Sequence, residues 1–234
     1  MNIAIIGYGK MGKSIEKIAI NRGHNIISKT NNTNDLVNLS AEIDVAIEFS
    51  KPSCAFENIS FCINHNIPVV SGTTGWLDKL NQVRELCNNQ NATFIYSSNF
   101  SISMNIVLAL NQITSKLIDY NIYNVHIEET HHITKKDSPS GTSISIAEAI
   151  CANSTEFKTW TSKIKENNKI LIKSKREKDN KGEHQIIYES KFDKITISHQ
   201  AISREGFAEG AVIAAEYAKD KKGYYTMSDI IKTL

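Results

Sequence analysis

The richest chemistry in this sequence lies between Glu128 and Thr142, where histidine, lysine and hydroxyl side chains stand close together. Two adjacent histidines, His131 and His132, are followed three residues later by Lys135. Histidine is the side chain whose ordinary pKa lies nearest neutrality, so it is the commonest proton carrier in catalysis. The lysine can supply a positive charge or a second proton. The spacing therefore favours a site that protonates a substrate.

The same stretch ends in Pro139-Ser140-Gly141-Thr142, which predicts a helix from Thr142 to about Cys151. Backbone N–H groups in the first turn of a helix bind anions. Those of Gly141 and Thr142, together with the threonine hydroxyl, would form such a seat. Histidine, lysine and an anion-binding helix start within a dozen residues suit a small carboxylate substrate.

Two other interpretations of the cluster remain open. The histidines could be ordinary loop residues, although a cluster of this density disfavours that. Glu128, His131 and His132 could instead bind zinc. Neighbouring residues of a strand point to opposite faces, which makes joint ligation by both histidines awkward, and no cysteine lies nearby. We therefore expect no metal.

A second motif stands near the start of the chain, where Gly7-Tyr8-Gly9-Lys10-Met11-Gly12 has the pattern G-x-G-x-x-G. The first glycine allows a tight turn, the second lets a pyrophosphate approach the backbone, and the third lets a helix pack against the sheet. The motif lies between an expected strand and an expected helix, which favours dinucleotide binding over a plain glycine turn. Lys10 can add charge to the phosphates or remain solvated.

Two further turns follow expected strands at the carboxyl edge, where α/β sheets bind ligands. Gly72-Thr73-Thr74-Gly75 suits contact with a ribose or a nicotinamide amide, or it is a turn capped by threonine. Ser97-Ser98-Asn99-Phe100 ends the next strand. Phe100 could stack beside a nicotinamide ring or seal a domain junction.

The elements that must position these residues alternate through the first hundred positions. Short apolar segments alternate with helical patterns, which is typical of a parallel sheet covered on both faces. The expected strands are Asn2–Ile6, Asn25–Ser28, Asp44–Phe49, Pro68–Ser71 and Thr93–Ser97, and the expected helices follow the glycine turn, Pro52 and Leu77.

After residue 100 a long helix is expected over Met104–Tyr120, with Ile106, Leu110, Ile113 and Leu117 on one face. Alternating segments at Tyr123–Thr130, Glu183–Ser190 and Lys194–Gln200 are typical of strands covered on one face. The tail from Phe207 returns to helix, with an alanine face and a last helical turn over Ser228–Leu234. We therefore predict an α/β fold, in which a Rossmann-type parallel-sheet domain (1–100 plus 207–234) carries an inserted α+β domain (101–206).

The composition and charge of the chain exclude several classes of partner. The formal net charge of +2 gives no electrostatic case for nucleic acid. No stretch approaches the apolar length of a membrane span, and the first residues do not resemble a signal peptide, so a cytoplasmic protein without a membrane partner is expected. The four cysteines are scattered, which indicates reduced thiols rather than a disulfide framework.

These motifs together resemble the dihydrodipicolinate reductase family. The resemblance rests on the glycine turn, on G-T-T-G after the fourth strand, on S-N-F-S near residue 100 and on H-H-x-x-K-x-D-x-P-S-G-T. It extends over nearly the whole chain, including the late turn Ser203-Arg204-Glu205-Gly206-Phe207.

The resemblance implies a role for each matching residue. His131 matches the proton donor or acceptor, Lys135 the second catalytic group, and His132, Gly141 and Thr142 the contacts to a substrate carboxylate. The residues expected to bind NADPH or NADH are Gly7, Gly9, Lys10, Met11, Gly12, Gly72, Thr73, Thr74, Ser97, Ser98, Asn99 and Phe100. The family is typically a homotetramer whose inserted domains, which bind substrate, form a shared sheet.

The implied reaction reduces a small cyclic dicarboxylate, 4-hydroxy-tetrahydrodipicolinate (dihydrodipicolinate), to tetrahydrodipicolinate with NAD(P)H in lysine and diaminopimelate biosynthesis. Two alternatives are another nicotinamide-dependent dehydrogenase of amino-acid metabolism and a non-catalytic dinucleotide-binding regulator. The chain departs from the family pattern at two places. Ile133 replaces a basic residue after the histidines, and the second strand ends Ser28-Lys29-Thr30-Asn31 without the usual acidic residue.

Overall fold

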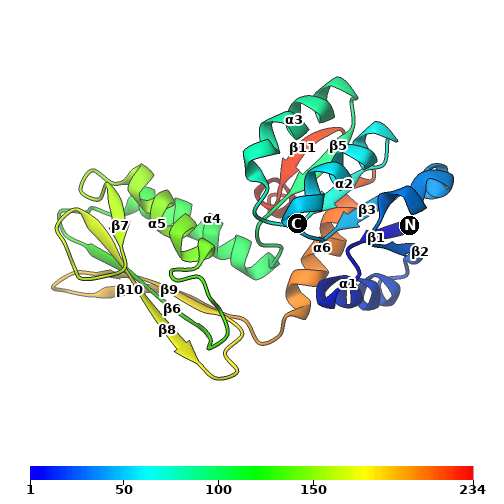
Figure 1. Cartoon of the computed structure of the whole chain (residues 1–234). Helices are drawn as coiled ribbons and strands as arrows, with labels where there is room; N and C mark the ends of the chain where they lie inside the picture. Colours follow the sequence, from blue (N-terminus) through cyan, green and yellow to red (C-terminus); the bar gives the residue numbers. More distant parts are fainter. Residues whose placement is uncertain (234) are drawn as a thin grey trace. The chain divides into compact units, whose positions relative to one another are not determined.

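The computed structural model describes residues 1–233, without the side chains of residues 38–40, and it consists of two compact units (Figure 1). The first unit comprises residues 1–102 and 205–234, and the second comprises residues 103–204. The divisions expected from the sequence, after residues 100 and 206, lie close to these.

The first unit is built on a six-stranded sheet in the order β11-β5-β4-β3-β1-β2. Every pair of neighbours runs parallel. The strands are β1 (Asn2–Ile6), β2 (Asn25–Thr30), β3 (Val45–Glu48), β4 (Val69–Ser71), β5 (Thr93–Tyr96) and β11 (Gly223–Thr226). The Rossmann-type parallel sheet predicted from the sequence is therefore confirmed. The edge strand β11 was not predicted, because four residues are too few to show a strand period beside the helical tail.

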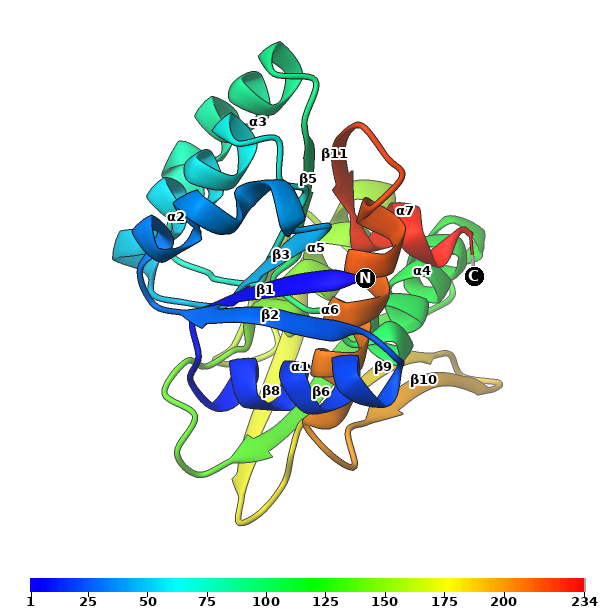
Figure 2. The ribbon, with the colours of Figure 1, turned by 90° about the vertical axis from the view of Figure 1, so that its right-hand side faces the viewer.

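Helices cover both faces of this sheet (Figure 2). Helices α1 (Lys10–Asn21) and α6 (Glu205–Ala218) lie on one face, and α2 (Pro52–Asn64) and α3 (Leu80–Asn89) lie on the other. Short 3-10 segments (Thr33–Glu42 and Leu77–Lys79) and α7 (Met227–Ile231) complete the unit.

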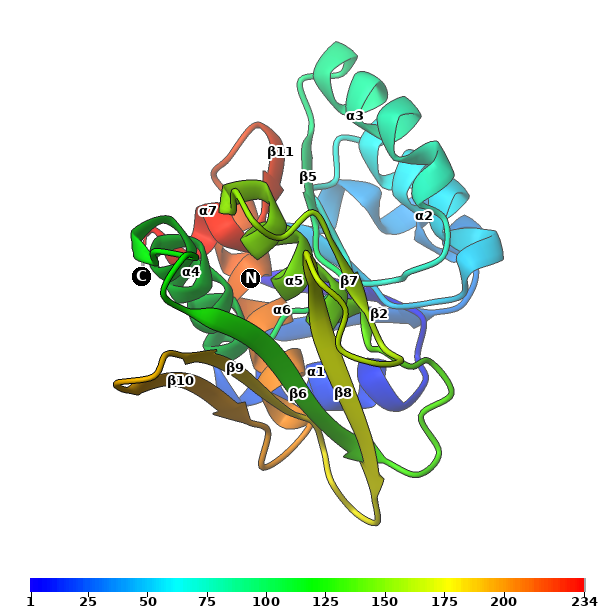
Figure 3. The same cartoon turned by 90° about the vertical axis from the view of Figure 1, so that its left-hand side faces the viewer.

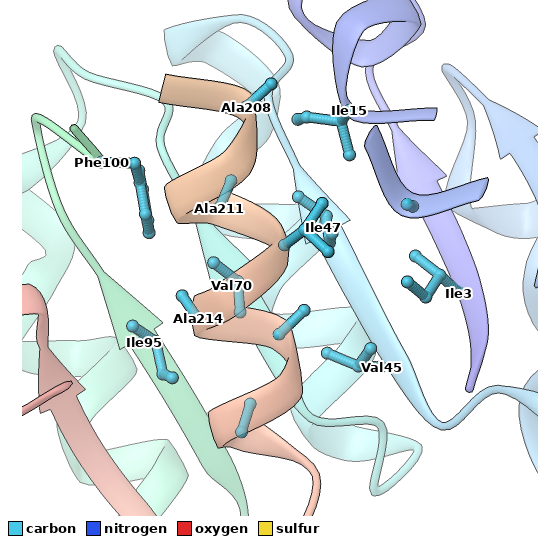
Figure 4. Close-up of a cluster of buried hydrophobic side chains, with 14 of the residues drawn as sticks. Ile3, Ile15, Val45, Ile47, Val70, Ile95, Phe100, Ala208, Ala211 and Ala214 are labelled. Carbon is cyan, nitrogen blue, oxygen red and sulfur yellow. The ribbon is translucent and has the colours of Figure 1, made fainter. Parts of the chain in front are cut away.

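The alanine face of α6 explains how that helix sits against the sheet. Ala208, Ala211 and Ala214 are fully buried against Ile47 and Val70 (Figure 4). Small side chains let the helix approach closely and keep the interior densely packed. This face holds the core beneath the carboxyl edge of the sheet.

The second unit contains a five-stranded mixed sheet in the order β10-β9-β6-β8-β7. The central strand β6 pairs parallel with β8 and antiparallel with β9. The strands are β6 (Asn124–His132), β7 (Thr159–Thr161), β8 (Lys169–Glu177), β9 (Glu183–Glu189) and β10 (Lys194–Gln200).

Helices α4 (Ile102–Leu117) and α5 (Gly141–Asn153) cover one face of that sheet (Figure 3). The buried face of α4 carries Met104, Val107, Asn111 and Ser115. Its apolar stripe of Ile106, Leu110, Ile113 and Leu117 is exposed. Among the described residues, no helix has the length and apolar character needed to cross a membrane.

Candidate active site

The glycine turn has the geometry that a close backbone approach requires. Gly7 has a φ of 95°, and a Cβ there would lie 2.1 Å from the carbonyl oxygen of Phe49. A Cβ on Gly12 would lie 2.4 Å from the carbonyl oxygen of Gly7. At Gly9 a Cβ would meet none of the described protein atoms within 4 Å, so this backbone faces open space. Each glycine therefore has the property predicted for it.

A pocket of about 360 Å³ opens beside this turn. Helix α1 begins at Lys10, with Gly9 as its N-cap, so its first N–H groups lie at the turn. Lys10 is exposed and Met11 is half-buried. The pocket is lined by Gly7, Gly9, Asn31, Phe49, Ser50, Lys51 and Cys54. It can accept a phosphate against backbone donors.

The turn after β4 is organised around the fully buried Glu48. Its carboxylate accepts hydrogen bonds from Ser71 Oγ at 2.6 Å, from Thr73 Oγ1 at 3.0 Å, and from the hydroxyl of Ser50. The Ser50 N–H also donates to Thr73 Oγ1 at 2.8 Å. The hydroxyl of Thr73 is thus engaged within the protein, and that of Thr74 is exposed.

The turn after β5 is held by its own polar groups. Ser97 Oγ donates to the carbonyl of Asn99 at 2.7 Å, while Ser98 is exposed. Phe100 is only 2% exposed and belongs to the buried cluster of the first unit (Figure 4). Its ring packs against that of Phe49, with ring centroids 5.6 Å apart. The ring of Phe100 therefore belongs to the core of the first unit.

The end of β2 carries Lys29 and lacks the acidic residue that is usual at this place in the family. Asn31 Oδ1 accepts from the N–H of Tyr8 at 3.1 Å, which ties this end of β2 to the glycine turn. Lys29 Nζ lies 3.0 Å from Glu16 and 5.1 Å from the centre of the Tyr8 ring. Asp35, the nearest acid along the chain, accepts from Thr30 Oγ1 at 2.6 Å.

In the second unit, the two histidines lie at the end of β6 and face opposite ways. His131 is 8% exposed, and His132 is half-buried. Burial lowers the pKa of His131, and Lys135 and Arg176 lower it further, while Glu129 opposes the shift. His131 is therefore neutral at pH 7 and can take up a proton at lower pH.

Behind His131 lies the fully buried carboxylate of Glu129. It accepts from Ser143 Oγ at 2.7 Å, from Ser174 Oγ at 2.7 Å and from the N–H of Ser140 at 3.1 Å. Burial opposes the charged form, but these hydrogen bonds outweigh it and lower the pKa of Glu129 to about 2. The site therefore contains a buried negative charge at neutral pH.

Lys135 lies on a loop that Arg176 fixes. Lys135 Nζ is 2.8 Å from the Asp137 carboxylate. Arg176 donates to the carbonyl of Asp137 at 2.6 Å and to that of Lys135 at 3.4 Å. The lysine is half-buried.

The residues predicted to bind an anion lie at the start of α5. Ser140 is the N-cap, and its hydroxyl accepts from the N–H of Ser143 at 3.2 Å. Gly141 is exposed and Thr142 is half-buried. The helix begins one residue earlier than predicted, so both N–H groups lie in its first turn.

His132 is held between two partners. Its Nε2 lies 3.1 Å from an Arg204 Nη2, and its Nδ1 lies 2.7 Å from Thr134 Oγ1. A guanidinium only donates hydrogen bonds, so Nε2 accepts and Nδ1 carries the proton. A pocket of about 580 Å³ beside His132 is also lined by Ile133, Lys178, Lys181 and Arg204. Three cations from other segments therefore line the pocket beside Ile133, together with the carboxylate of Asp179.

The zinc set considered from the sequence, Glu128 with His131 and His132, does not converge. Glu128 pairs with Lys173 at 2.9 Å on the outer face of the sheet. In the part of the chain that the structure describes, the group with metal-like spacing is Glu129, His131 and His184, with ligand atoms within 4.8 Å of one another. Both oxygens of Glu129 already accept hydrogen bonds from serine groups.

Comparisons with known proteins agree along the whole chain. The family model for the N-terminus of dihydrodipicolinate reductase matches residues 1–100, and that for its C-terminus matches residues 103–231. A 4-hydroxy-tetrahydrodipicolinate reductase of Christiangramia forsetii is 48% identical over all of this chain and 99% of its own length. The chain belongs to the dihydrodipicolinate reductase family. It is accordingly an NAD(P)H-dependent oxidoreductase, and the resemblance seen in the sequence is confirmed.

More distant relatives agree with this placement. A 4-hydroxy-tetrahydrodipicolinate reductase of Rickettsia rickettsii is 35% identical over 99% of both chains. A dipicolinate-bound dihydrodipicolinate reductase from Paenisporosarcina sp. TG-14 has the same fold, with a TM-score of 0.82, 22% identity and 97% of each chain covered.

Sequence reasoning missed several residues of the reductase site. Glu129 lies two residues before His131 and had no assigned role, and Arg176, His184 and Arg204 lie 34 or more residues beyond Thr142, where the motif ends. The register of β6 with β8 and β9 places Arg176 and His184 beside the histidines, since His131 lies opposite Arg176 and Glu129 lies opposite His184. The alternating pattern at 183–190 predicted a strand, but it contained no information on its register.

Proposed function

We propose that this chain reduces 4-hydroxy-tetrahydrodipicolinate to tetrahydrodipicolinate, with the dinucleotide bound by the first unit and the dicarboxylate by the second. One observation carries the proposal. A proton carrier (His131), two cations (Lys135 and Arg176) and the start of α5 lie together at one end of β6. A small dicarboxylate needs such an arrangement, and a simple dinucleotide-binding regulator does not.

The first unit fits a dinucleotide in its steric details. Gly7 and Gly12 occupy positions that a side chain would block, and Gly9 faces open space at the start of α1. These residues would hold the pyrophosphate, with Lys10 and Met11 beside it. Gly72 and Thr74, with the backbone from Ser97 to Phe100, would border the nicotinamide half. When bound, the nicotinamide supplies the hydride.

The second unit would bind and protonate the substrate. The N–H groups of Gly141 and Thr142 would accept one carboxylate, and His132 with Lys135 would orient the ring. His131 would deliver the proton through Nε2, because its Nδ1 is buried. Gly182 borders the Nε2 edge of the ring, since a Cβ there would lie 3.4 Å from Nε2, and glycine places no side chain against it.

We further propose a homotetramer, as the family resemblance implies. Large apolar side chains are exposed on the second unit, among them Leu117 at 79%, Phe192 at 76% and Ile202 at 91%. Light scattering of the purified protein measures the assembly directly, and a monomer across the working concentration range would contradict it.

The decisive experiment is turnover with His131→Gln. Loss of a general acid–base group should lower kcat by about 10²- to 10⁴-fold, while folding and cofactor binding stay nearly unchanged. Oxidation of NADPH and NADH is followed with the dihydrodipicolinate precursor, and with other oxo acids as the comparison. Activity of His131→Gln within a few-fold of the parent would show that the role is misassigned. A regulator would bind cofactor and turn over none of these substrates.

A further inference from the structure

We propose that Glu129 is a positioning residue that holds His131, the start of α5 and the Lys135 loop in one arrangement, with His184 as a second support for the His131 ring. The inference rests on the proposed function, in which these three parts bind and protonate the substrate. Glu129 itself is fully buried, so it touches no substrate and acts through other residues.

The link to α5 is direct. The Ser140 N–H and the Ser143 hydroxyl both donate to the Glu129 carboxylate. Ser140 is the N-cap residue that precedes Gly141. The Glu129 carboxylate on β6 thus fixes the position of the first turn of α5, where the substrate carboxylate would bind.

The link to the Lys135 loop passes through Arg176. An Arg176 Nη1 lies 3.7 Å from Glu129, and the same side chain donates to the carbonyls of Lys135 and Asp137. Ser174, also on β8, donates to Glu129 at 2.7 Å. Strand β8 therefore carries the restraint from the buried carboxylate to the loop.

The link to His131 is electrostatic. Glu129 lies 3.8 Å from His131 Nδ1, which is buried and has no hydrogen-bond partner among the described residues. His184 packs edge-on against the His131 ring, with centroids 5.0 Å apart. The charged or titratable groups that face His131 are Glu129 on β6, Lys135 and Asp137 on the loop, Arg176 on β8 and His184 on β9.

Glu129 is the buried negative charge in this set, so it stabilises the protonated ring that the cations destabilise. An opposite charge at this separation shifts a pKa by about one unit or more. The same atoms could in principle bind a metal, but the two carboxylate oxygens are already filled by serine donors. Orientation of a proton carrier is therefore the use that their hydrogen bonds favour.

The test compares Glu129→Gln with Glu128→Gln. The control removes a carboxylate one residue away, on the outer face of the same strand. For Glu129→Gln we expect kcat to fall about 10- to 100-fold, the magnitude typical of residues that orient an active group. The Michaelis constant for the dicarboxylate should rise, and that for the cofactor should stay unchanged. Glu128→Gln should have the same kcat as the parent and the same Michaelis constants for the dicarboxylate and for the cofactor.

A second readout needs no substrate. In protein with 13C-labelled histidine, the His131 resonance, assigned by its loss in His131→Gln, should titrate about one pH unit lower or more in Glu129→Gln. An unchanged titration and pH profile would overturn the proposal, as would stoichiometric zinc that the parent binds and Glu129→Gln loses. If Glu129→Gln does not fold, His184→Gln replaces it, with a lower kcat, a shifted His131 titration and an unchanged cofactor constant expected. A parent without turnover would contradict the proposed function alone, because the titration is measured independently.

Discussion

Among the described residues, each unit contains one fully buried glutamate on a strand, Glu48 at the end of β3 and Glu129 within β6, and the two carboxylates differ in what surrounds them. Glu48 of the first unit is bonded to hydroxyls and a backbone N–H, from Ser50, Ser71 and Thr73. Glu129 of the second unit has a similar shell of serine donors. In addition, a guanidinium and two imidazoles lie 3.7 to 3.9 Å from it.

The difference separates two uses of the same side chain. A carboxylate among neutral donors holds loop ends together, because it satisfies several hydroxyls at once. A carboxylate among titratable rings also sets which protonation states are stable. The arrangement around Glu48 suits a binding site for a cofactor that itself supplies the reactive group. The arrangement around Glu129 suits a site in which protein side chains transfer a proton.

The largest expected effect is on the free energy of unfolding at acid pH. Histidines surround the buried Glu129 of the second unit, whereas the donors around Glu48 of the first unit are hydroxyls and a backbone N–H. Burial, and then the neighbouring His131, lowers the pKa of His184 to about 4 from the usual 6.5. The unfolded chain therefore takes up the proton first as pH falls from 6.5. Below pH 4 both states bind it, so the unfolding free energy should fall by about 3 kcal/mol across this window.

The two tryptophans allow the units to be followed separately, since Trp76 lies in the first and Trp160 in the second. Urea unfolding of Trp76→Phe reports on the second unit, and that of Trp160→Phe on the first. His184→Gln should flatten the pH dependence that Trp160 reports. If both units lost the same unfolding free energy as the pH falls, and His184→Gln did not change this, the surroundings of Glu48 and Glu129 would not differ in their effect on acid stability.

The next effect sharpens the roles within the second unit. Lys135→Ala should lower kcat about a hundredfold, the low end for a group that assists proton transfer, and should also raise the Michaelis constant. Thr142→Val should mainly raise the Michaelis constant, because it removes a hydroxyl from the proposed binding site for the substrate carboxylate. Steady-state kinetics with Lys136→Ala as the exposed neighbouring control separates these cases. Equal and small effects at both positions would place the dicarboxylate elsewhere.

The two regions also differ in how far the sequence predicts them. The glycine turn is local, so its pattern predicted both the conformation of Gly7 and the close packing of Gly12. The second site depends on pairing between distant strands, and the β6 pattern alone could not show that Arg176 and His184 would lie beside it. Side-chain direction was also hidden, because nothing in G-T-T-G tells that the Thr73 hydroxyl turns toward Glu48.

A smaller effect tests Glu48 itself. Glu48→Gln leaves at least one buried hydroxyl without an acceptor, which should reduce the unfolding free energy of the first unit by about 1–3 kcal/mol. The Michaelis constant for the cofactor should rise, since the turn of Gly72 and Thr73 loses its anchor. Glu57→Gln, on the exposed side of α2, is the control. The pH profile of kcat should not change, and a shift like that expected of Glu129→Gln would make the two carboxylates equivalent.

The smallest effect concerns cofactor choice in the first unit, where the end of β2 has no acid. A carboxylate at that place binds the ribose hydroxyls of NADH and repels the 2′-phosphate of NADPH. Here Asn31 accepts from the Tyr8 N–H, and the nearby charge is Lys29, which is 45% exposed and paired with Glu16. We therefore expect NADPH to be used at least as well as NADH.

Asn31→Asp should move that preference toward NADH, because aspartate keeps the acceptor for Tyr8 and adds a negative charge. Repulsion of about 1 kcal/mol at a solvated contact corresponds to a change of about fivefold in the ratio of specificity constants. Asn32→Asp adds the same charge one residue on, where the side chain accepts from the Asn34 N–H instead. At fixed ionic strength the ratio should change for Asn31→Asp and much less for Asn32→Asp. A parent that strongly prefers NADH, or equal shifts in both variants, would mean that the ribose lies away from Asn31 and that only the net charge of the loop matters.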